Sequence, residues 1–83
     1  MSRETTPPEP QKLRTLKKGI IGIIRTLPSD PERRSQCIRL GLTVGARVSC
    51  LERLPGGTIV LATNRQEIAL GKGLSEQIEV VVE

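Results

Sequence analysis

Two cysteines are the residues of this 83-residue chain best suited to metal or redox chemistry. Cys37 and Cys50 could act as soft ligands or as a redox pair, but a structural zinc site takes four ligands and the chain has no histidine to help complete one. Sites for other transition metals generally use imidazole, carboxylates or clusters of thiolates. We therefore expect buried, reduced thiols at both positions, with no metal site and no cofactor.

Other features that an enzyme needs are scarce. Histidine, the usual general base near neutral pH, is absent. Gly71-Lys72-Gly73 invites comparison with a phosphate-binding loop, but such a loop needs a longer glycine-rich segment and then Lys-Ser/Thr at the start of a helix. We interpret these glycines as turn residues, and we predict that the protein is not an enzyme.

Binding of single-stranded nucleic acid by stacking is also excluded, because the chain contains no Phe, Tyr or Trp. The net charge is +4, and residues 1–18 contribute +3 of it, five basic side chains against two acidic ones. The basic character therefore lies mostly in the N-terminal segment rather than on a folded face. We interpret this segment as a solubilising leader, and weak contact with RNA or an anionic membrane surface stays open.

Three arginines, Arg33, Arg34 and Arg39, fall within a segment that is predicted to be helical. We expect them to face outward, away from the sheet. Such a row is either a solvated helix face or a contact for an acidic partner. Both interpretations stay open at this point.

Residues 1–12 contain three of the six prolines and no Ile, Leu or Val, so we assign them to a flexible tail and residues 13–83 to one domain. The longest apolar run, residues 19–24, is much shorter than the roughly 18 residues of a membrane span. The N-terminus also lacks the apolar core of a signal peptide. We therefore expect a cytoplasmic protein.

The rest of the chain is predicted to be mainly β, with one short helix between the first and second strands. Asp30 as N-cap and Pro31 at the first helical position start the helix, although Ser29 is spaced as an alternative cap, and Gly41 ends it. Its apolar positions, together with the residue just beyond it, are expected to pack on the sheet: Cys37, Ile38, Leu40 and Leu42. The predicted strands are residues 19–27, 46–54, 58–63, 66–70 and 77–82. Five short strands at close spacing favour a small closed barrel.

Three local features refine this prediction. Gly22 within the first strand indicates a bulge or a close backbone approach. Leu13 and Leu16, one helical turn apart, are placed to plug one end of the core. Pro55-Gly56 is typical of a type II turn, in which the glycine takes a positive φ.

An ordered set of motifs spans residues 13–82, and the set resembles the ferrous iron transport protein A (FeoA) family. The set consists of Leu13-x-x-Leu16-x-x-Gly19, Leu40-Gly41-Leu42-x-x-Gly45-x-x-Val48, Ile68-Ala69-Leu70, Leu74-Ser75 and Ile78-x-Val80. The resemblance implies a five-stranded SH3-like barrel. Among these residues we take Gly19, Leu40, Gly41, Leu42 and Gly45 as its structural motif.

The resemblance also implies a small cytoplasmic accessory protein of bacterial ferrous iron uptake. Its expected partner is the cytosolic part of a large membrane permease with a GTPase domain (FeoB), and we expect Arg33, Arg34 and Arg39 to contact an acidic patch on it. Two alternatives remain. One is an RNA-associated barrel, and the other is a structural or homodimerising module similar to the C-terminal domain of iron-dependent repressors.

Overall fold

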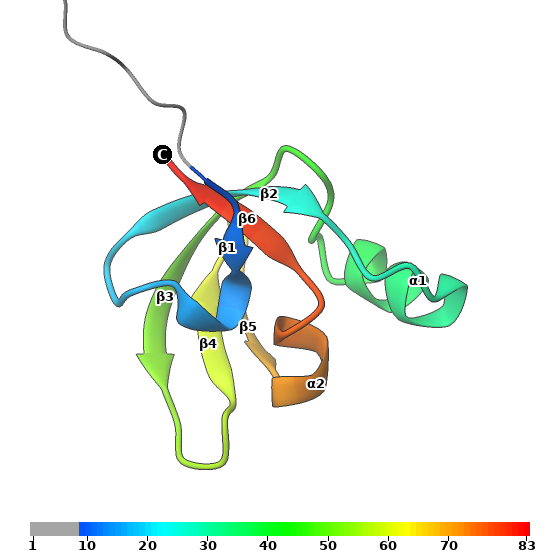
Figure 1. Cartoon of the computed structure of the whole chain (residues 1–83). Coiled ribbons are helices and arrows are strands. Elements are labelled where there is room, and N and C mark those ends of the chain that lie inside the picture. Colours follow the sequence, from blue (N-terminus) through cyan, green and yellow to red (C-terminus); the bar gives the residue numbers. More distant parts are fainter. Residues whose placement is uncertain (1–8) are drawn as a thin grey trace, which may run out of the picture.

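The computed structural model describes residues 9–83, and Figure 1 shows a curled sheet with one helix projecting from it. The elements in chain order are β1 (Gln11–Lys12), the 3-10 helix η1 (Leu13–Thr15), β2 (Ile21–Thr26), α1 (Pro31–Arg39), β3 (Arg47–Arg53), β4 (Ile59–Ala62), β5 (Glu67–Leu70), α2 (Lys72–Ser75) and β6 (Glu79–Val82). The strands predicted from the sequence are confirmed, each within a few residues of its expected limits. None of the helices in this part of the chain has the length and apolar composition needed to cross a bilayer.

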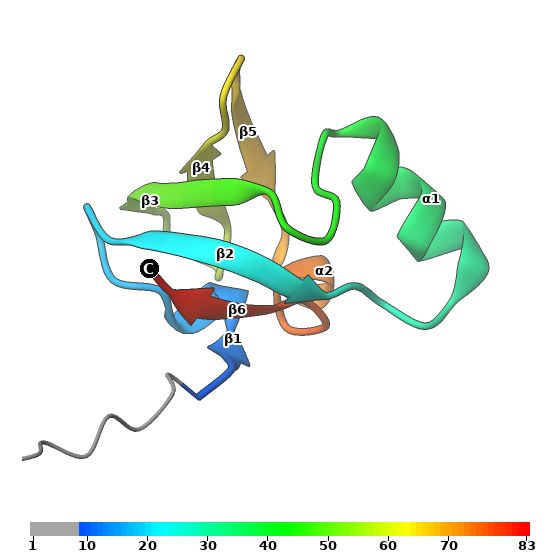
Figure 2. The ribbon, with the colours of Figure 1, turned by 90° about the horizontal axis from the view of Figure 1, so that it is seen from above.

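The strands form a single antiparallel sheet in the order β1-β6-β2-β3-β4-β5, which curls into an SH3-like barrel (Figures 1 and 2). The predicted fold, a mainly β SH3-like barrel with one short helix, is confirmed, and only the predicted number of strands differs. A sixth strand, β1, is present, and within the described residues β1 and β5 are the two edges of the sheet rather than a hydrogen-bonded pair. Near the seam between these two edges η1 contacts α2, so the packing of two helices takes the place of strand pairing there.

Strand β1 lies inside the segment that we assigned to the tail. Gln11 pairs with Val80 and Lys12 with Glu79, and the backbone N–H of Leu13 then donates to the carbonyl of Ile78 at 2.8 Å. Pairing of this kind uses only backbone groups, so a segment without aliphatic side chains gives no sign of it in a hydropathy pattern. Residues 1–8 of the predicted tail lie outside the described residues.

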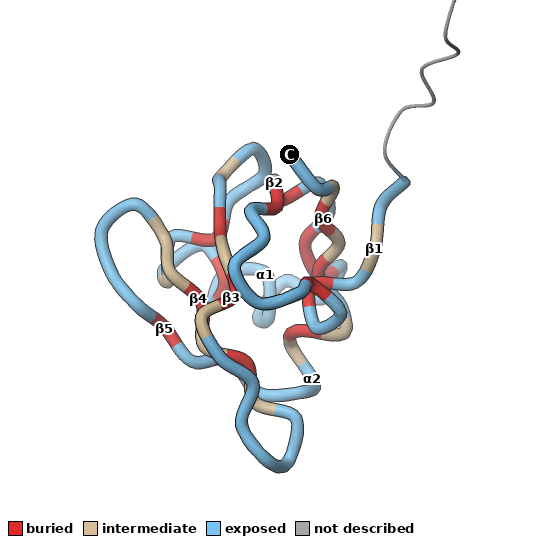
Figure 3. Tube along the Cα trace, turned by 90° about the vertical axis from the view of Figure 1, so that its left-hand side faces the viewer, coloured by how far each residue is buried: buried red, intermediate tan, exposed pale blue. Residues whose placement is uncertain are grey.

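The core fills the inside of the curled sheet, as the red segments in Figure 3 show. Leu13 and Leu16 are fully buried and belong to this core, as predicted. Cys37 and Cys50 are both buried and both free, as expected. The other buried apolar residues are Ile24, Leu27, Leu42, Val48, Ile59, Leu61, Ile68, Leu70, Ile78 and Val80.

Gly22 marks a close approach, one of the two alternatives that its position indicated. A Cβ atom built at Gly22 would lie 3.2 Å from both Cβ and Cγ2 of Val80, and 3.4 Å from Cδ1 of Leu16. The bulge in this strand lies further along, between Ile24 and Thr26 in the pairing with β6. At the β3–β4 turn Gly56 has a φ of +89°, as the type II turn prediction requires.

Helix α1 begins as predicted, because the Asp30 carboxylate accepts a hydrogen bond from the backbone N–H of Arg33 at 3.0 Å and Pro31 follows it. The expectation that its apolar side chains all pack on the sheet was wrong in part. Cys37 is the one buried residue of the helix, and Ile38 is 49% exposed. The reason is visible in Figures 1 and 2, where α1 projects beside the barrel, so that only a narrow stripe of the helix faces the core.

Candidate partner-binding groove

A groove of about 620 Å³ lies where the C-terminal end of α1 and the loop after it face the β4–β5 turn. Its lining comes from two stretches of chain, residues 38–47 and 63–66, which are separated by β4 and by all of β3 after its first residue. The lining residues are Ile38, Arg39, Leu40, Gly41, Thr43, Val44, Gly45, Ala46, Arg47, Thr63, Asn64, Arg65 and Gln66. We call this feature the α1 groove.

The first wall of the α1 groove is shaped by the segment Leu40-Gly41-Leu42. Gly41 ends the helix with a φ of +87°, a conformation that favours glycine, and its N–H donates to the carbonyl of Ile38 at 2.9 Å. The N–H of Leu42 donates to the carbonyl of Cys37 at 2.9 Å, and the Leu42 side chain is fully buried. The helix end is thereby anchored to the barrel directly beside the groove.

The loop then returns to the sheet at Gly45, which has a φ of +94°. Its N–H donates to the carbonyl of Ile24 at 2.7 Å, and the N–H of Ile24 donates to the carbonyl of Ala46 at 2.9 Å. This reciprocal pair of hydrogen bonds joins the loop to β2. Val44, just before it, is left 58% exposed at the groove.

The second wall is the β4–β5 turn, in which the N–H of Thr63 donates to the carbonyl of Gln66 at 2.8 Å. The side chain of Gln66 crosses to the first wall, where its Nε2 donates to the carbonyl of Leu40 at 3.2 Å. Carbonyls in the last turn of a helix lack intrahelical partners, so this bond satisfies one of them and joins the two walls.

The groove combines exposed aliphatic side chains with positive charge. Ile38 and Val44 are large apolar residues that are about half exposed. Arg39, Arg47 and Arg65 line the same groove, and no acidic side chain among residues 9–83 does. Arg47 is held by Glu83, with Nη2 and Oε1 2.7 Å apart, whereas the other two arginines make no ion pair with any described residue. Such a surface is suited to an acidic segment of a protein that carries an apolar side chain.

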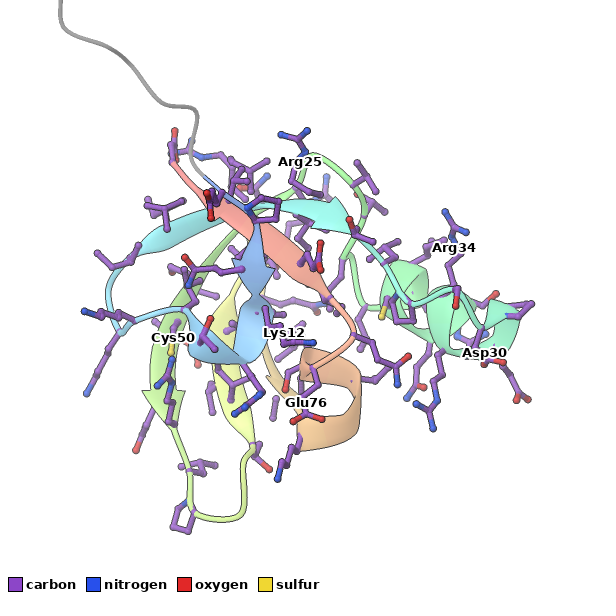
Figure 4. All side chains as sticks on the ribbon, viewed as in Figure 1. Lys12, Arg25, Asp30, Arg34, Cys50 and Glu76 are labelled. Carbon is purple, nitrogen blue, oxygen red and sulfur yellow. The ribbon has the colours of Figure 1, made fainter. Side chains whose placement is uncertain are left out.

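The residues predicted as a partner contact are only partly brought together here. Arg33, Arg34 and Arg39 are all exposed, as expected, but only Arg39 lines the groove. Figure 4 shows the side chain of Arg34 directed away from the barrel. Whether these arginines bind a partner stays a prediction.

The predicted motif residues separate into three groups. Leu40, Gly41 and Gly45 line the groove, and Leu42 is buried beneath it. Gly19 belongs to the turn before β2, with a φ of +81° and its N–H bonded to the carbonyl of Cys50 at 2.9 Å. Gly19 therefore serves the barrel and not the groove.

Sequence reasoning missed the roles of Val44, Arg47, Arg65 and Gln66. The only available signal was the helix end itself, because its last carbonyls need donors from elsewhere in the chain. Nothing in the spacing of residues 63–66 indicates that this turn supplies the donor. The contact depends on how the sheet curls.

Burial raises the pKa of the Cys37 thiol above its ordinary value of 9.0, so the group stays protonated at neutral pH. Among residues 9–83, no group of three or more metal-ligating side chains lies together.

Comparison with known proteins gives the groove its context. The model of the FeoA domain matches residues 11–82, which is most of the chain and includes both walls of the groove. The chain belongs to the FeoA domain family. Family membership confirms the resemblance drawn from the motifs and supports a role of this FeoA-domain protein in ferrous iron transport.

Solved structures agree with this assignment. The crystal structure of an iron uptake regulatory protein (FeoA) matches with a TM-score of 0.83 at 28% identity, over 90% of this chain and 100% of that chain. The solution structure of the FeoA protein from Chlorobium tepidum matches with a TM-score of 0.78 at 27% identity, over 87% of this chain and 70% of that chain. No curated protein matches the chain.

The same fold also occurs within a metal-dependent regulator. A manganese-dependent transcriptional repressor matches with a TM-score of 0.84 at 25% identity, over 95% of this chain but only 44% of that chain. The FeoA-domain protein thus corresponds to one part of the longer repressor.

Proposed function

We propose that this protein is a cytoplasmic, non-catalytic accessory protein of ferrous iron uptake, and that it acts by binding the cytosolic part of a FeoB-type GTPase permease. The observation that carries the proposal is the α1 groove, in which exposed Ile38 and Val44 lie among three arginines in a chain that belongs to the FeoA family. Iron is the cargo of the permease in this proposal, and the FeoA-domain protein does not hold it.

The groove supports a mechanism of docking rather than of chemistry. An apolar side chain of the partner inserts between Ile38 and Val44, and carboxylates beside it meet Arg39 and Arg65. Charges at the rim of an interface change the association rate and its salt dependence more than the final affinity. The aliphatic centre of the groove therefore holds the partner, and the arginines set its orientation.

Uptake of radioactive ferrous iron by cells that lack this protein tests the proposed function. We expect uptake to fall when the protein is removed and to recover when the wild-type protein is supplied. The Val44→Asp variant, which puts a carboxylate among the apolar contacts, should fold normally because Val44 is exposed, and it should fail to restore uptake. Unchanged uptake in the absence of the protein would contradict the proposal.

Affinity capture from detergent-solubilised membranes tests the partner. We expect the tagged wild-type protein to recover the permease, and Val44→Asp to lose it. Recovery of RNA in place of the permease would favour an RNA-associated barrel. If the protein recovers only itself and sediments as a dimer, the homodimerising module is the better account.

A further inference from the structure

A second group of charges lies on η1, the loop from Lys17 to Ile20, the end of β3 and α2, and the loop lies on the side of the barrel away from α1 (Figures 1 and 2). Its basic side chains are Arg14, Lys17, Lys18, Arg53 and Lys72, and we call it the basic end. The α1 groove accounts for none of them. Neither does the core, because all five are exposed.

Hydrogen bonds hold these residues on one continuous surface. The Nη2 of Arg53 donates to the carbonyl of Leu16, which brings β3 against η1 and the start of the loop. Lys18 forms a β-bridge with Cys50, so the lysine loop runs beside the same strand. Arg14, Arg53 and Lys72 also line one hollow of about 380 Å³ beside the β3–β4 turn.

Acidic residues offset only part of this charge. Glu76 pairs with Arg14, with Oε2 and Nε 3.2 Å apart, and Glu52 is exposed on β3 next to Arg53. Figure 4 shows Glu76 close to Lys12, another basic residue. Lys17, Lys18 and Lys72 form no ion pair with a described residue.

Exposed aliphatic side chains border the same surface. Of the six large hydrophobic residues that are exposed among residues 9–83, three lie here, namely Ile20, Leu54 and Val82, each 37–39% exposed. Lys17, Ile20 and Val82 line a common hollow of about 260 Å³. Of the other three, Ile38 and Val44 belong to the α1 groove, and Ile21 lines a hollow with Arg47 next to it.

Lysines that lie beside exposed aliphatic residues suit the boundary between lipid headgroups and acyl chains. Aliphatic side chains enter the boundary, while lysine stems lie along it and keep their ammonium groups among the headgroups. RNA is a poorer fit, because the chain has no aromatic side chain on which bases could stack. We propose that the basic end docks on an anionic phospholipid bilayer.

This placement leaves the α1 groove free, because α1 projects from the other side of the barrel (Figure 2). A protein held on the bilayer by its basic end can therefore bind a partner with the groove at the same time. The inference goes beyond the proposed function and does not require it, since it depends only on the loop, the β3–β4 turn and the charges there.

Co-sedimentation of the full chain with lipid vesicles tests the inference. We expect vesicles of phosphatidylcholine mixed with phosphatidylglycerol to retain the protein at low salt, and vesicles of phosphatidylcholine alone to retain little. The Lys17→Glu/Lys18→Glu variant should lose at least about tenfold in affinity, because each basic residue near an anionic surface contributes about 1 kcal/mol. Ile20→Ser should also weaken binding, most visibly at high salt.

Arg33→Glu/Arg34→Glu is the matched control, because it changes the net charge by the same amount on helix α1. We expect this control to keep nearly all of its vesicle binding, and far-UV circular dichroism verifies that each variant is folded. Equal losses in the two charge-reversed variants would overturn the proposal, since net charge alone would then explain binding. Equal retention on both kinds of vesicle would overturn it too, as would binding of polyuridine RNA by a protein that leaves the vesicles in solution.

Discussion

Replacement of Gly22 by alanine tests how closely β2 and β6 approach inside the barrel. The added methyl carbon would lie 3.2 Å from two side-chain atoms of Val80 and 3.4 Å from Leu16. Contacts of 3.2 Å require these neighbours to move by a few tenths of an ångström, in a core where Val80 and Leu16 are both fully buried. Overpacking of this kind costs about 1–3 kcal/mol.

For a domain of this size, such a loss corresponds to a melting temperature lower by roughly 5–20 °C. Thermal unfolding followed by far-UV circular dichroism is the suitable assay, because the chain has no Trp, Tyr or Phe to give a fluorescence signal. Gly73→Ala is the matched control. A Cβ atom at Gly73 would meet nothing within 4 Å, and the position lies in helix α2, so alanine should stabilise the protein by about 0.4–1 kcal/mol.

The two substitutions add the same methyl group and are expected to act in opposite directions. A Gly22→Ala protein that melts at or above the temperature of Gly73→Ala would refute the argument from close packing. Val80→Ala gives a further test, because it opens space beside the added methyl. The double variant Gly22→Ala/Val80→Ala should therefore be more stable than the sum of the two single changes predicts.

Three further substitutions address the helix, the buried thiol and the core. Asp30→Ala removes the N-cap of α1 and should lower the free energy of unfolding by about 1 kcal/mol. Amide hydrogen exchange should become faster in the helix and change less in the sheet. Unchanged exchange in the helix would show that the cap is unimportant. Cys37 has a raised pKa in the folded state, so its contribution to stability should be complete below pH 9.0 and decrease as the pH rises above it. Urea unfolding between pH 7 and pH 10 measures how the free energy of unfolding changes with pH. If this free energy falls with pH as steeply in Cys37→Ala as in the wild-type protein, the prediction is contradicted. Leu16→Ala should lower the free energy of unfolding by about 3 kcal/mol in the same assay, and a loss below about 1 kcal/mol would mean that Leu16 does not plug the core.

Much of the barrel could be predicted from the sequence because local patterns determine it. Alternating aliphatic residues, the Asp30-Pro31 start of α1 and the glycines at turns all act over a few residues, and each was found near its expected place. Strand β1 was missed because Gln11 and Lys12 pair through their backbones alone. The seam between β1 and β5 was missed for a related reason, since closure depends on how far the whole sheet curls.

Only the first wall of the α1 groove, which one continuous stretch of chain forms, could be predicted from the sequence. Leu40, Gly41 and Gly45 were identified from their motif, and Arg39 from its place on the helix. Arg65 joins them from a turn more than twenty residues away, through a contact that no local pattern encodes. The exposure of Ile38 was mistaken for burial, because two adjacent apolar residues on a helix do not reveal how broad its contact with the sheet is.

The most direct test of the central claim is a binding measurement between this protein and the purified cytosolic domain of the FeoB-type permease from the same organism. The account predicts a saturable interaction that Arg39→Glu/Arg65→Glu weakens about tenfold at low salt and less at high salt, while Arg33→Glu/Arg34→Glu changes it little. A larger loss in the Arg33/Arg34 variant would move the contact to the outer face of α1. If the wild-type protein shows no interaction at any salt concentration, the proposed function is contradicted.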